Sequence, residues 1–234
     1  MRNDSREPSP GHPEDVPVLR NDPNPGNQLP RVLVLAESEA DAELISNELQ
    51  STWMTLMTGR VDSADAFIAA LDAFAPDVVV SGHPVGQFGA LELLEMLRAA
   101  RPTAAFIIVT DALTDAESVA AIRAGAEDLI LKVYVSRITT AINEALAVRR
   151  PLRQLSPRQV EVLQLVAQGS RTRDIAARLG LSIKTVESHR GEIMKRLGLH
   201  DLVSLVRYAM RVGLVPSGGD VSQQRRGEGE GVPV

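Results

Sequence analysis

The sequence predicts an α/β domain with a doubly wound parallel sheet, followed by a smaller all-α domain. Residues 31–147 alternate short apolar runs with helical patterns, whereas residues 152–213 carry helical patterns only. The chain has 234 residues, of which 44% are hydrophobic, enough for two domains with cores of their own. We expect domains at 31–148 and 156–213, joined by a linker at 149–155.

The first domain is predicted to contain five βα units. Four of its five strand candidates are short apolar runs, as expected for parallel strands that helices cover on both faces. The predicted strands are Arg31–Leu35, Thr58–Val61, Asp77–Ser81, Ala105–Thr110 and Asp128–Leu131. The predicted helices are Ala40–Gln50, Ala64–Ala73, Leu91–Ala100, Asp115–Ala124 and Arg137–Val148. In such sheets functional groups gather where the strands end.

Both ends of the chain predict disorder. Residues 1–30 hold 7 of the 14 prolines, and residues 216–234 are polar and glycine-rich. The absence of cysteine excludes disulfides, thiolate zinc sites and cysteine nucleophiles. No apolar run approaches the roughly 18 residues of a membrane helix, and the N-terminus has no signal-peptide pattern. We therefore expect a cytoplasmic protein.

Charge is divided unequally between the two domains. Residues 31–150 carry 9 basic and 17 acidic side chains, whereas residues 151–215 carry 11 basic and 5 acidic ones. The formal net charge of −5 conceals this contrast. A basic module attached to an acidic body indicates nucleic acid as a partner at one end.

The basic module has the pattern of a helix-turn-helix. Ser156, Pro157 and Gln159 form a helix-start signature, with a serine cap, a proline in the first position and a capping box. We expect Thr172 to cap the second helix and Ser182 to cap a third that ends at Leu197. The glycine-containing turn between the second and third helices is typical of DNA-binding helix pairs.

One side of the third helix fits the major groove of DNA. At 100° per residue, Lys184, Ser188, Gly191 and Lys195 fall on one line, opposite the apolar residues. Lysines suit phosphates, and small polar residues allow close approach to base edges. The alternative reading is an ordinary solvated helix face.

The segment that begins LSPRQVEVLQLVAQGSRTRDIAARLGLS and continues through TVESHR and IMKRLGL resembles the LuxR/NarL-type DNA-binding domain. The resemblance implies four helices, base reading by the third, and dimerisation through the fourth, about residues 200–212. It assigns base reading to Glu187, Ser188 and Gly191, and backbone contacts to Thr172, Arg173, Lys184, Thr185 and Lys195. It places the dimer helix contacts on Leu202, Leu205, Val206 and Ala209.

Residues 31–148 resemble the receiver domain of FixJ-like response regulators through RVLVLAESEADAELI, PDVVVSGHPVGQFGALELLEMLR and FIIVTDALTDAESVAAIRAGAEDLILK. A receiver uses an aspartate nucleophile, an acidic pair for Mg²⁺, and a threonine and lysine that grip the phosphoryl group. This chain departs from that pattern, because Ala36 and Glu37 replace the acidic pair and Gly82 replaces the nucleophile, while Thr110 and Lys132 are retained. The resemblance therefore predicts a degenerate phosphorylation pocket.

Two ion pairs are predicted from these patterns. Lys132 lacks an aspartate partner at Gly82, so we expect it to pair with Glu37. Arg190, on the inner side of its helix, is expected to pair with Glu161.

The resulting hypothesis is a DNA-binding transcriptional regulator that acts without phosphorylation and binds inverted repeats as a homodimer. Two alternatives stay open: a regulator gated by a small ligand in the vacated pocket, and a protein-interaction adaptor. No nucleophile–base pair or metal-ligand cluster indicates an enzyme, and no cofactor is expected.

Overall fold

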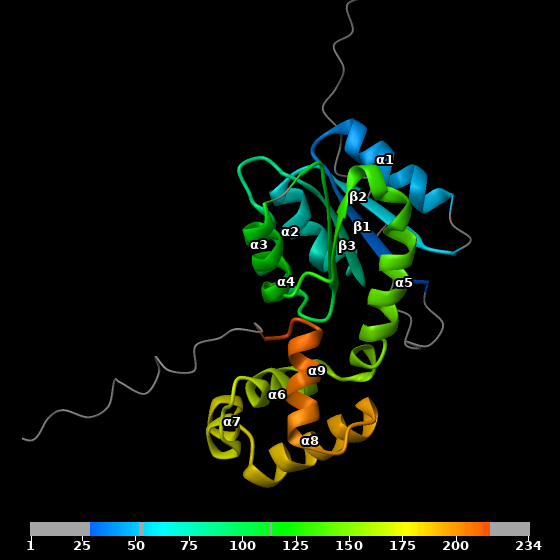
Figure 1. Cartoon of the computed structure of the whole chain (residues 1–234). Helices are drawn as coiled ribbons and strands as arrows, with labels where there is room; N and C mark the ends of the chain where they lie inside the picture. Colours follow the sequence, from blue (N-terminus) through cyan, green and yellow to red (C-terminus); the bar gives the residue numbers. More distant parts are fainter. Residues whose placement is uncertain (1–28, 52–53, 113, 216–234) are drawn as a thin grey trace, which may run out of the picture.

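The computed structural model describes residues 29–51, 54–112 and 114–215. The two segments expected to be disordered, 1–30 and 216–234, therefore lie almost wholly outside the described residues. The described chain forms two domains that lie one below the other in Figure 1, an α/β domain above a helical one.

The first domain contains a five-stranded parallel sheet of order β2-β1-β3-β4-β5 (Figure 1). Its strands are β1 (Arg31–Leu35), β2 (Met57–Val61), β3 (Val78–His83), β4 (Ala105–Thr110) and β5 (Asp128–Leu131). Its helices are α1 (Glu39–Gln50), α2 (Ala64–Ala73), α3 (Ala90–Ala100), α4 (Asp115–Ala124) and α5 (Ile138–Arg149). A 3-10 segment, η2 (Lys132–Arg137), joins β5 to α5. The order and direction of the strands confirm the predicted doubly wound, receiver-like fold.

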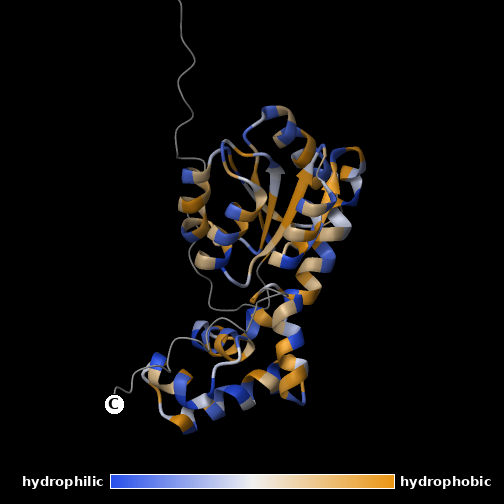
Figure 2. Ribbon diagram, turned by 60° about the vertical axis from the view of Figure 1, so that its left-hand side comes forward, coloured by the Kyte–Doolittle hydropathy of each residue, from blue (hydrophilic) through white to orange (hydrophobic). Residues whose placement is uncertain are grey.

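Each face of this sheet has its own apolar core. Along β1, Leu33 and Leu35 pack with residues of α2 and α3, whereas Val32 and Val34 pack with residues of α1 and α5. Alternate residues of a strand point to opposite faces, so a fully apolar strand is buried on both sides. Figure 2 shows hydrophobic colour along the strands and hydrophilic residues on the outer sides of the helices.

The second domain consists of α6 (Pro157–Ala167), α7 (Thr172–Leu179), α8 (Ile183–Leu197) and α9 (Leu202–Arg211) around one core. The predicted capping box is present, because the backbone N–H of Ser156 donates to the side chain of Gln159 and the N–H of Gln159 donates back. Ser182 caps α8 as predicted. Thr172 does not cap α7, since Arg171 occupies the cap position and Thr172 is the first helical residue.

The segment expected to be a linker is structured and partly buried. Helix α5 continues to Arg149, and Leu152–Gln154 form a 3-10 turn, η3. Leu152 and Leu155 are buried in the core of the helical domain. The predicted linker therefore comprises the last residue of α5 and the structured beginning of that core.

Candidate functional site

The structure exposes the line on α8 that the sequence predicted to meet DNA. Lys184, Ser188, Gly191 and Lys195 are all exposed, while Val186 and Ile193 on the opposite side are buried. We call the exposed set the DNA-facing line. A Cβ added at Gly191 would meet nothing within 4 Å, so no packing contact among the described residues requires a glycine there. Among the other predicted contact residues, Arg173 and Glu187 are exposed, and Thr172 and Thr185 are half-buried.

Helix α8 is held by polar contacts as well as by its apolar side. The buried amide of Gln159 donates to the carboxylate of Glu192 across 2.9 Å, which ties α8 to the start of α6. The predicted pair between Arg190 and Glu161 is wrong. Arg190 donates to the hydroxyl of Thr172 at 3.1 Å.

Glu161 pairs instead with Arg158, three residues earlier on the same helix. Such neighbours lie side by side on a helix surface, and this proximity explains why the local partner replaces the distant one.

Helix α9 offers only part of its predicted dimer surface. Leu205 and Ala209 are buried in the core of the helical domain, so in this arrangement they are not available to a second copy. Leu202 is 46% exposed and Val206 is half-buried. Val203, which the sequence analysis did not select, is 62% exposed. The two most exposed apolar residues of α9 therefore lie at its beginning, and Met210 near its end is also exposed.

At the carboxyl ends of the strands, the positions of the predicted phosphorylation pocket carry no nucleophile. Ala36, Gly82 and Thr110 lie there and are buried, and a Cβ added at Gly82 would lie 3.5 Å from the Cβ of Ala36. The hydroxyl of Thr110 donates to the backbone oxygen of Ala112 at 3.1 Å. Neither Ala36 nor Gly82 supplies a side-chain oxygen, and the described ranges contain no group of three or more metal-ligating side chains. The residues present do not fit a Mg²⁺ site.

Lys132 lies beside this pocket, but its partners differ from the predicted one. Its ammonium is 2.6 Å from Asp41 of α1 and 2.7 Å from Asp111, which follows β4. Glu37 is exposed and accepts a hydrogen bond from the backbone N–H of Gly86, so the predicted pair of Glu37 with Lys132 is wrong. Burial opposes the charged form of Lys132, yet the hydrogen bonds that its ammonium donates to Asp111 and Asp41, together with the charges of these carboxylates, outweigh burial and raise the pKa of Lys132.

A second polar centre lies at the opposite end of the sheet, where the two domains meet. Arg149, at the end of α5, is 2% exposed and pairs with Glu127 of the receiver-like domain. It also donates to the backbone oxygen of Val212, just after α9, and to that of Pro102. One guanidinium therefore joins the last turn of the helical domain to two loops of the receiver-like domain.

Two glycine backbones touch beside Arg149. Gly125 and Gly213 both have positive φ, 103° and 65°. A Cβ added at Gly213 would lie 2.8 Å from the Cα of Gly125 and 2.9 Å from its backbone oxygen. Only glycine allows so close an approach in this backbone conformation.

Tyr208 of α9 adds a contact by donating to the backbone oxygen of Val148 at 3.1 Å. Burial raises the pKa of Tyr208 to about 12, so at neutral pH its hydroxyl remains protonated and able to donate. We call this set of contacts, Arg149 with Glu127 and Val212, Gly125 with Gly213, and Tyr208 with Val148, the domain junction.

Comparison with known proteins addresses the helical domain directly. Residues 153–209 match the luxR family of bacterial regulatory proteins. This segment is a LuxR-type domain. The match spans η3 and α6 to α8 and most of α9, so the exposed DNA-facing line lies inside it. The matched family consists of regulatory proteins and not of enzymes.

Similar curated proteins extend the comparison. The chain is 38% identical over 121 residues to the transcriptional regulatory protein TdiR of Thauera aromatica, covering 45% of this chain and 53% of the relative. It is 43% identical over 65 residues to the oxygen regulatory protein NreC of Staphylococcus aureus, covering 28% of this chain and 30% of the relative. The matches thus span about half, or less, of the length of these relatives.

Full-length FixJ from B. japonicum is a solved structure similar to this chain. It is 25% identical, with a TM-score of 0.44, and the comparison covers 80% of this chain and 98% of that one. Within the described residues, no helix combines the length and apolar character needed to cross a membrane.

Proposed function

We propose that this protein is a transcriptional regulator that binds DNA through α8 of its LuxR-type domain. The observation that carries the proposal is the exposure of the DNA-facing line together with the capped and anchored geometry of its helix. Lysines at both ends of the line suit phosphates, and Ser188 and Gly191 between them allow approach to bases. Duplex DNA in the bacterial cytoplasm is the proposed partner.

The regulator is proposed to act without aspartyl phosphorylation. Gly82 and Ala36 supply no carboxylate, and the lysine that would grip a phosphoryl group already has two carboxylate partners. The proposed assembly is a homodimer on an inverted repeat, because a two-fold symmetric protein reads two related half-sites. The exposed Leu202 and Val203 support a role for the start of α9 in pairing.

The test is selection of bound duplexes from a random library by the full chain, with and without a phosphodonor and Mg²⁺. We expect enrichment of an inverted repeat that the donor does not change. Enrichment only with the donor would overturn phosphorylation independence. Enrichment in neither condition would overturn DNA binding and favour the adaptor.

Two variants separate the roles on α8. Lys184→Ala should weaken binding to all sequences and reduce its salt dependence, because it removes a phosphate contact. Ser188→Ala should instead change the preferred sequence. Arg137→Ala, which removes a cation from the receiver-like domain, serves as the control for net charge. Equal losses on every sequence for Lys184 and Ser188 variants would contradict the assignment of base reading.

A further inference from the structure

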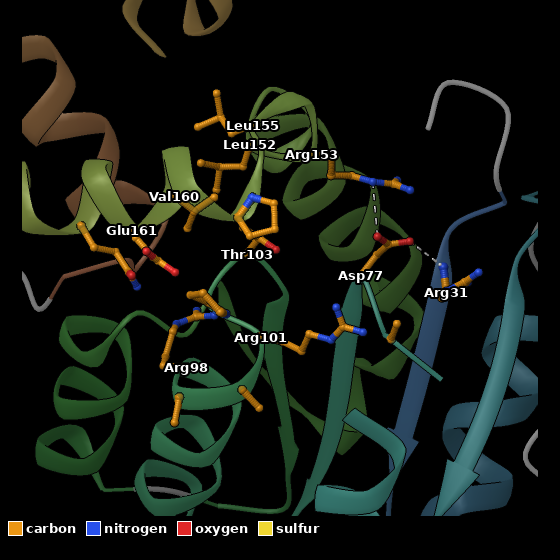
Figure 3. A pocket seen from close by; sticks show the side chains of 16 residues that line it. Arg31, Asp77, Arg98, Arg101, Thr103, Leu152, Arg153, Leu155, Val160 and Glu161 are labelled. Carbon is orange, nitrogen blue, oxygen red and sulfur yellow. Dashed lines mark hydrogen bonds and ion pairs between the residues drawn. The ribbon is translucent and has the colours of Figure 1, made fainter. Parts of the chain in front are cut away.

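A polar cleft of about 600 Å³ lies between the two domains, on the side of the sheet where the strands begin. Figure 3 shows Arg98 and Arg101 on one side of it, with Val160 and Glu161 of α6 across from them. Arg31, Asp77 and Arg153 form its far end (Figure 3). The cleft exists only because the LuxR-type domain is docked on the receiver-like domain.

Positive charge in the cleft exceeds negative charge, and the acids are already engaged. Asp77 pairs with Arg153 at 3.3 Å and accepts the backbone N–H of Arg31. Glu161 pairs with Arg158, which does not line the cleft. The remaining arginines therefore have no carboxylate of the cleft available to them.

Arg101 and Arg31 are the clearest cases of cations without an acidic partner. The Nε of Arg101 donates to the backbone oxygen of Leu71 at 2.8 Å, and Arg31 donates to that of Phe74 at 3.4 Å. Within the described chain neither guanidinium has a carboxylate partner, and neutral oxygens balance no charge. A guanidinium presents several N–H groups in a plane, a shape that matches the oxygens of a phosphate.

Arg98 adds a further cation to the cleft, and its only carboxylate partner within the described chain is Glu127, 3.8 Å away and shared with Arg149. The two terminal nitrogens of Arg98 donate to the backbone oxygens of Ala104 and Gly125, while its buried Nε has no acceptor within the described chain. Burial, and then the like charge of Arg149, lower the pKa of Arg98 to about 9. An anion bound in the cleft would favour the charged form of Arg98 and oppose this lowering of its pKa.

The opposite wall determines what else the ligand contains. Pro157, Glu161 and Gln164 line it from the LuxR-type domain, above the buried Leu152, Leu155 and Val160. Thr103 on the facing side and Gln164 offer hydrogen bonds. A volume near 600 Å³ lies within the range of small-molecule sites and exceeds what a single phosphate ion occupies. Arginines that face Pro157 and the polar side chains of Thr103 and Gln164 suit a molecule in which a phosphate group is joined to a larger part able to form hydrogen bonds.

We propose that this interdomain cleft binds a phosphate-bearing small molecule of the nucleotide class, and that it does so only while the domains are docked. The site lies away from both the vacated receiver pocket and the DNA-facing line, so it does not depend on the proposed function. A ligand held by both domains would stabilise their docked arrangement, since it binds that arrangement alone.

The test measures thermal stability and calorimetric binding of the full chain, without DNA, with ATP, tripolyphosphate and sulfate as probes. We expect saturable binding of ATP, weaker binding of tripolyphosphate and little effect of sulfate. Arg101→Gln and Arg31→Gln should each weaken ATP binding about tenfold, the effect of losing one charge-assisted hydrogen bond. Arg137→Gln makes the same charge change outside the cleft and should leave binding unchanged.

Two further variants locate the bound anion. Lys184→Ala should not change ATP binding, and loss of binding in this variant would place the anion on the DNA-facing line and overturn the proposal. Gly213→Ala should weaken ATP binding, because it disturbs the docked arrangement without altering charge. Absence of saturable binding, or equal binding by the Arg101, Arg31 and Arg137 variants, would also overturn it. The melting temperature of each variant without ATP, compared with that of the parent, identifies any variant that fails to fold. If one arginine variant fails to fold, the other still tests the proposal.

Discussion

The two ends of the parallel sheet carry charge in different ways. At the carboxyl ends, Lys132 meets Asp41 and Asp111, and the side chain of Asp111 is 79% exposed. At the amino ends, Arg149 is 2% exposed and Glu127 has a side chain that is 12% exposed. Receiver-like sheets place their chemistry at the first end. In this chain the more deeply buried ion pair lies at the second end, where it joins the two domains.

The comparison indicates what each end contributes. A buried ion pair with further hydrogen bonds depends strongly on every partner, because removal of one leaves the other charged and desolvated. A partly exposed pair is screened by water and contributes less. The domain junction is therefore expected to control the arrangement of the domains, whereas the vacated pocket is expected to tolerate change.

The largest expected effect is at the domain junction. Arg149→Ala should lower the free energy of unfolding by about 3 kcal/mol, because Glu127 loses its buried partner and Val212 loses a donor. Arg137→Ala, which breaks an exposed pair with Asp128, should cost at most about 1 kcal/mol. Denaturant unfolding of both variants measures the difference. Equal losses of unfolding free energy in the two variants would contradict the expected difference between the buried and the exposed ion pair.

A smaller effect is expected from Gly213→Ala. The new Cβ would meet the backbone of Gly125, so the domains should separate, at a cost of about 1–3 kcal/mol. Gly169→Ala is the matched control, since Gly169 also has positive φ but has nothing within 4 Å of its Cβ position. Small-angle scattering should show a larger radius of gyration for Gly213→Ala only. An unchanged radius in both would show that this close contact does not hold the domains together.

The smallest effect is expected at the vacated pocket. A double-mutant cycle with Lys132→Met and Asp41→Asn should give a coupling energy of about 1 kcal/mol, since both side chains are 18% exposed. The same cycle with Glu37→Gln should give no coupling beyond about 0.3 kcal/mol, because Glu37 bonds to Gly86. Unfolding free energies of the single and double variants provide both values. Coupling to Glu37 as strong as to Asp41 would reinstate the pairing that the structure contradicts.

Much of the fold could be predicted because it depends on local patterns. The predicted bounds are confirmed for five elements, β1, β4, β5, α2 and α4. Apolar runs and helical periodicity can be recognised in the sequence without knowledge of long-range contacts. The predicted helix caps at Ser156 and Ser182 are also confirmed, because a cap involves only residues within one helical turn.

The ion pairs could not be predicted in the same way. Lys132 pairs with Asp41 of α1 because α1 packs against η2, the segment that contains Lys132. The separation of these two residues in the sequence does not reveal that contact. The sequence predicts a linker that starts at Arg149, because nothing near Arg149 in the sequence identifies Glu127 and Val212 as its partners. Contacts between separate domains produce no periodic pattern in the sequence. They become visible only in a structure that contains both domains.

Helix α9 connects the domain junction to the exposed apolar surface formed by Leu202 and Val203. Its final turn is fixed by Gly213 and Tyr208, while Leu202 and Val203 are exposed at its beginning. Leu205 and Ala209, between these two ends, are buried in the core of the helical domain, so α9 cannot move by itself. Any change at the domain junction would therefore reposition the whole helical domain, and with it the start of α9, about 15 Å along the helix, where two copies are proposed to meet.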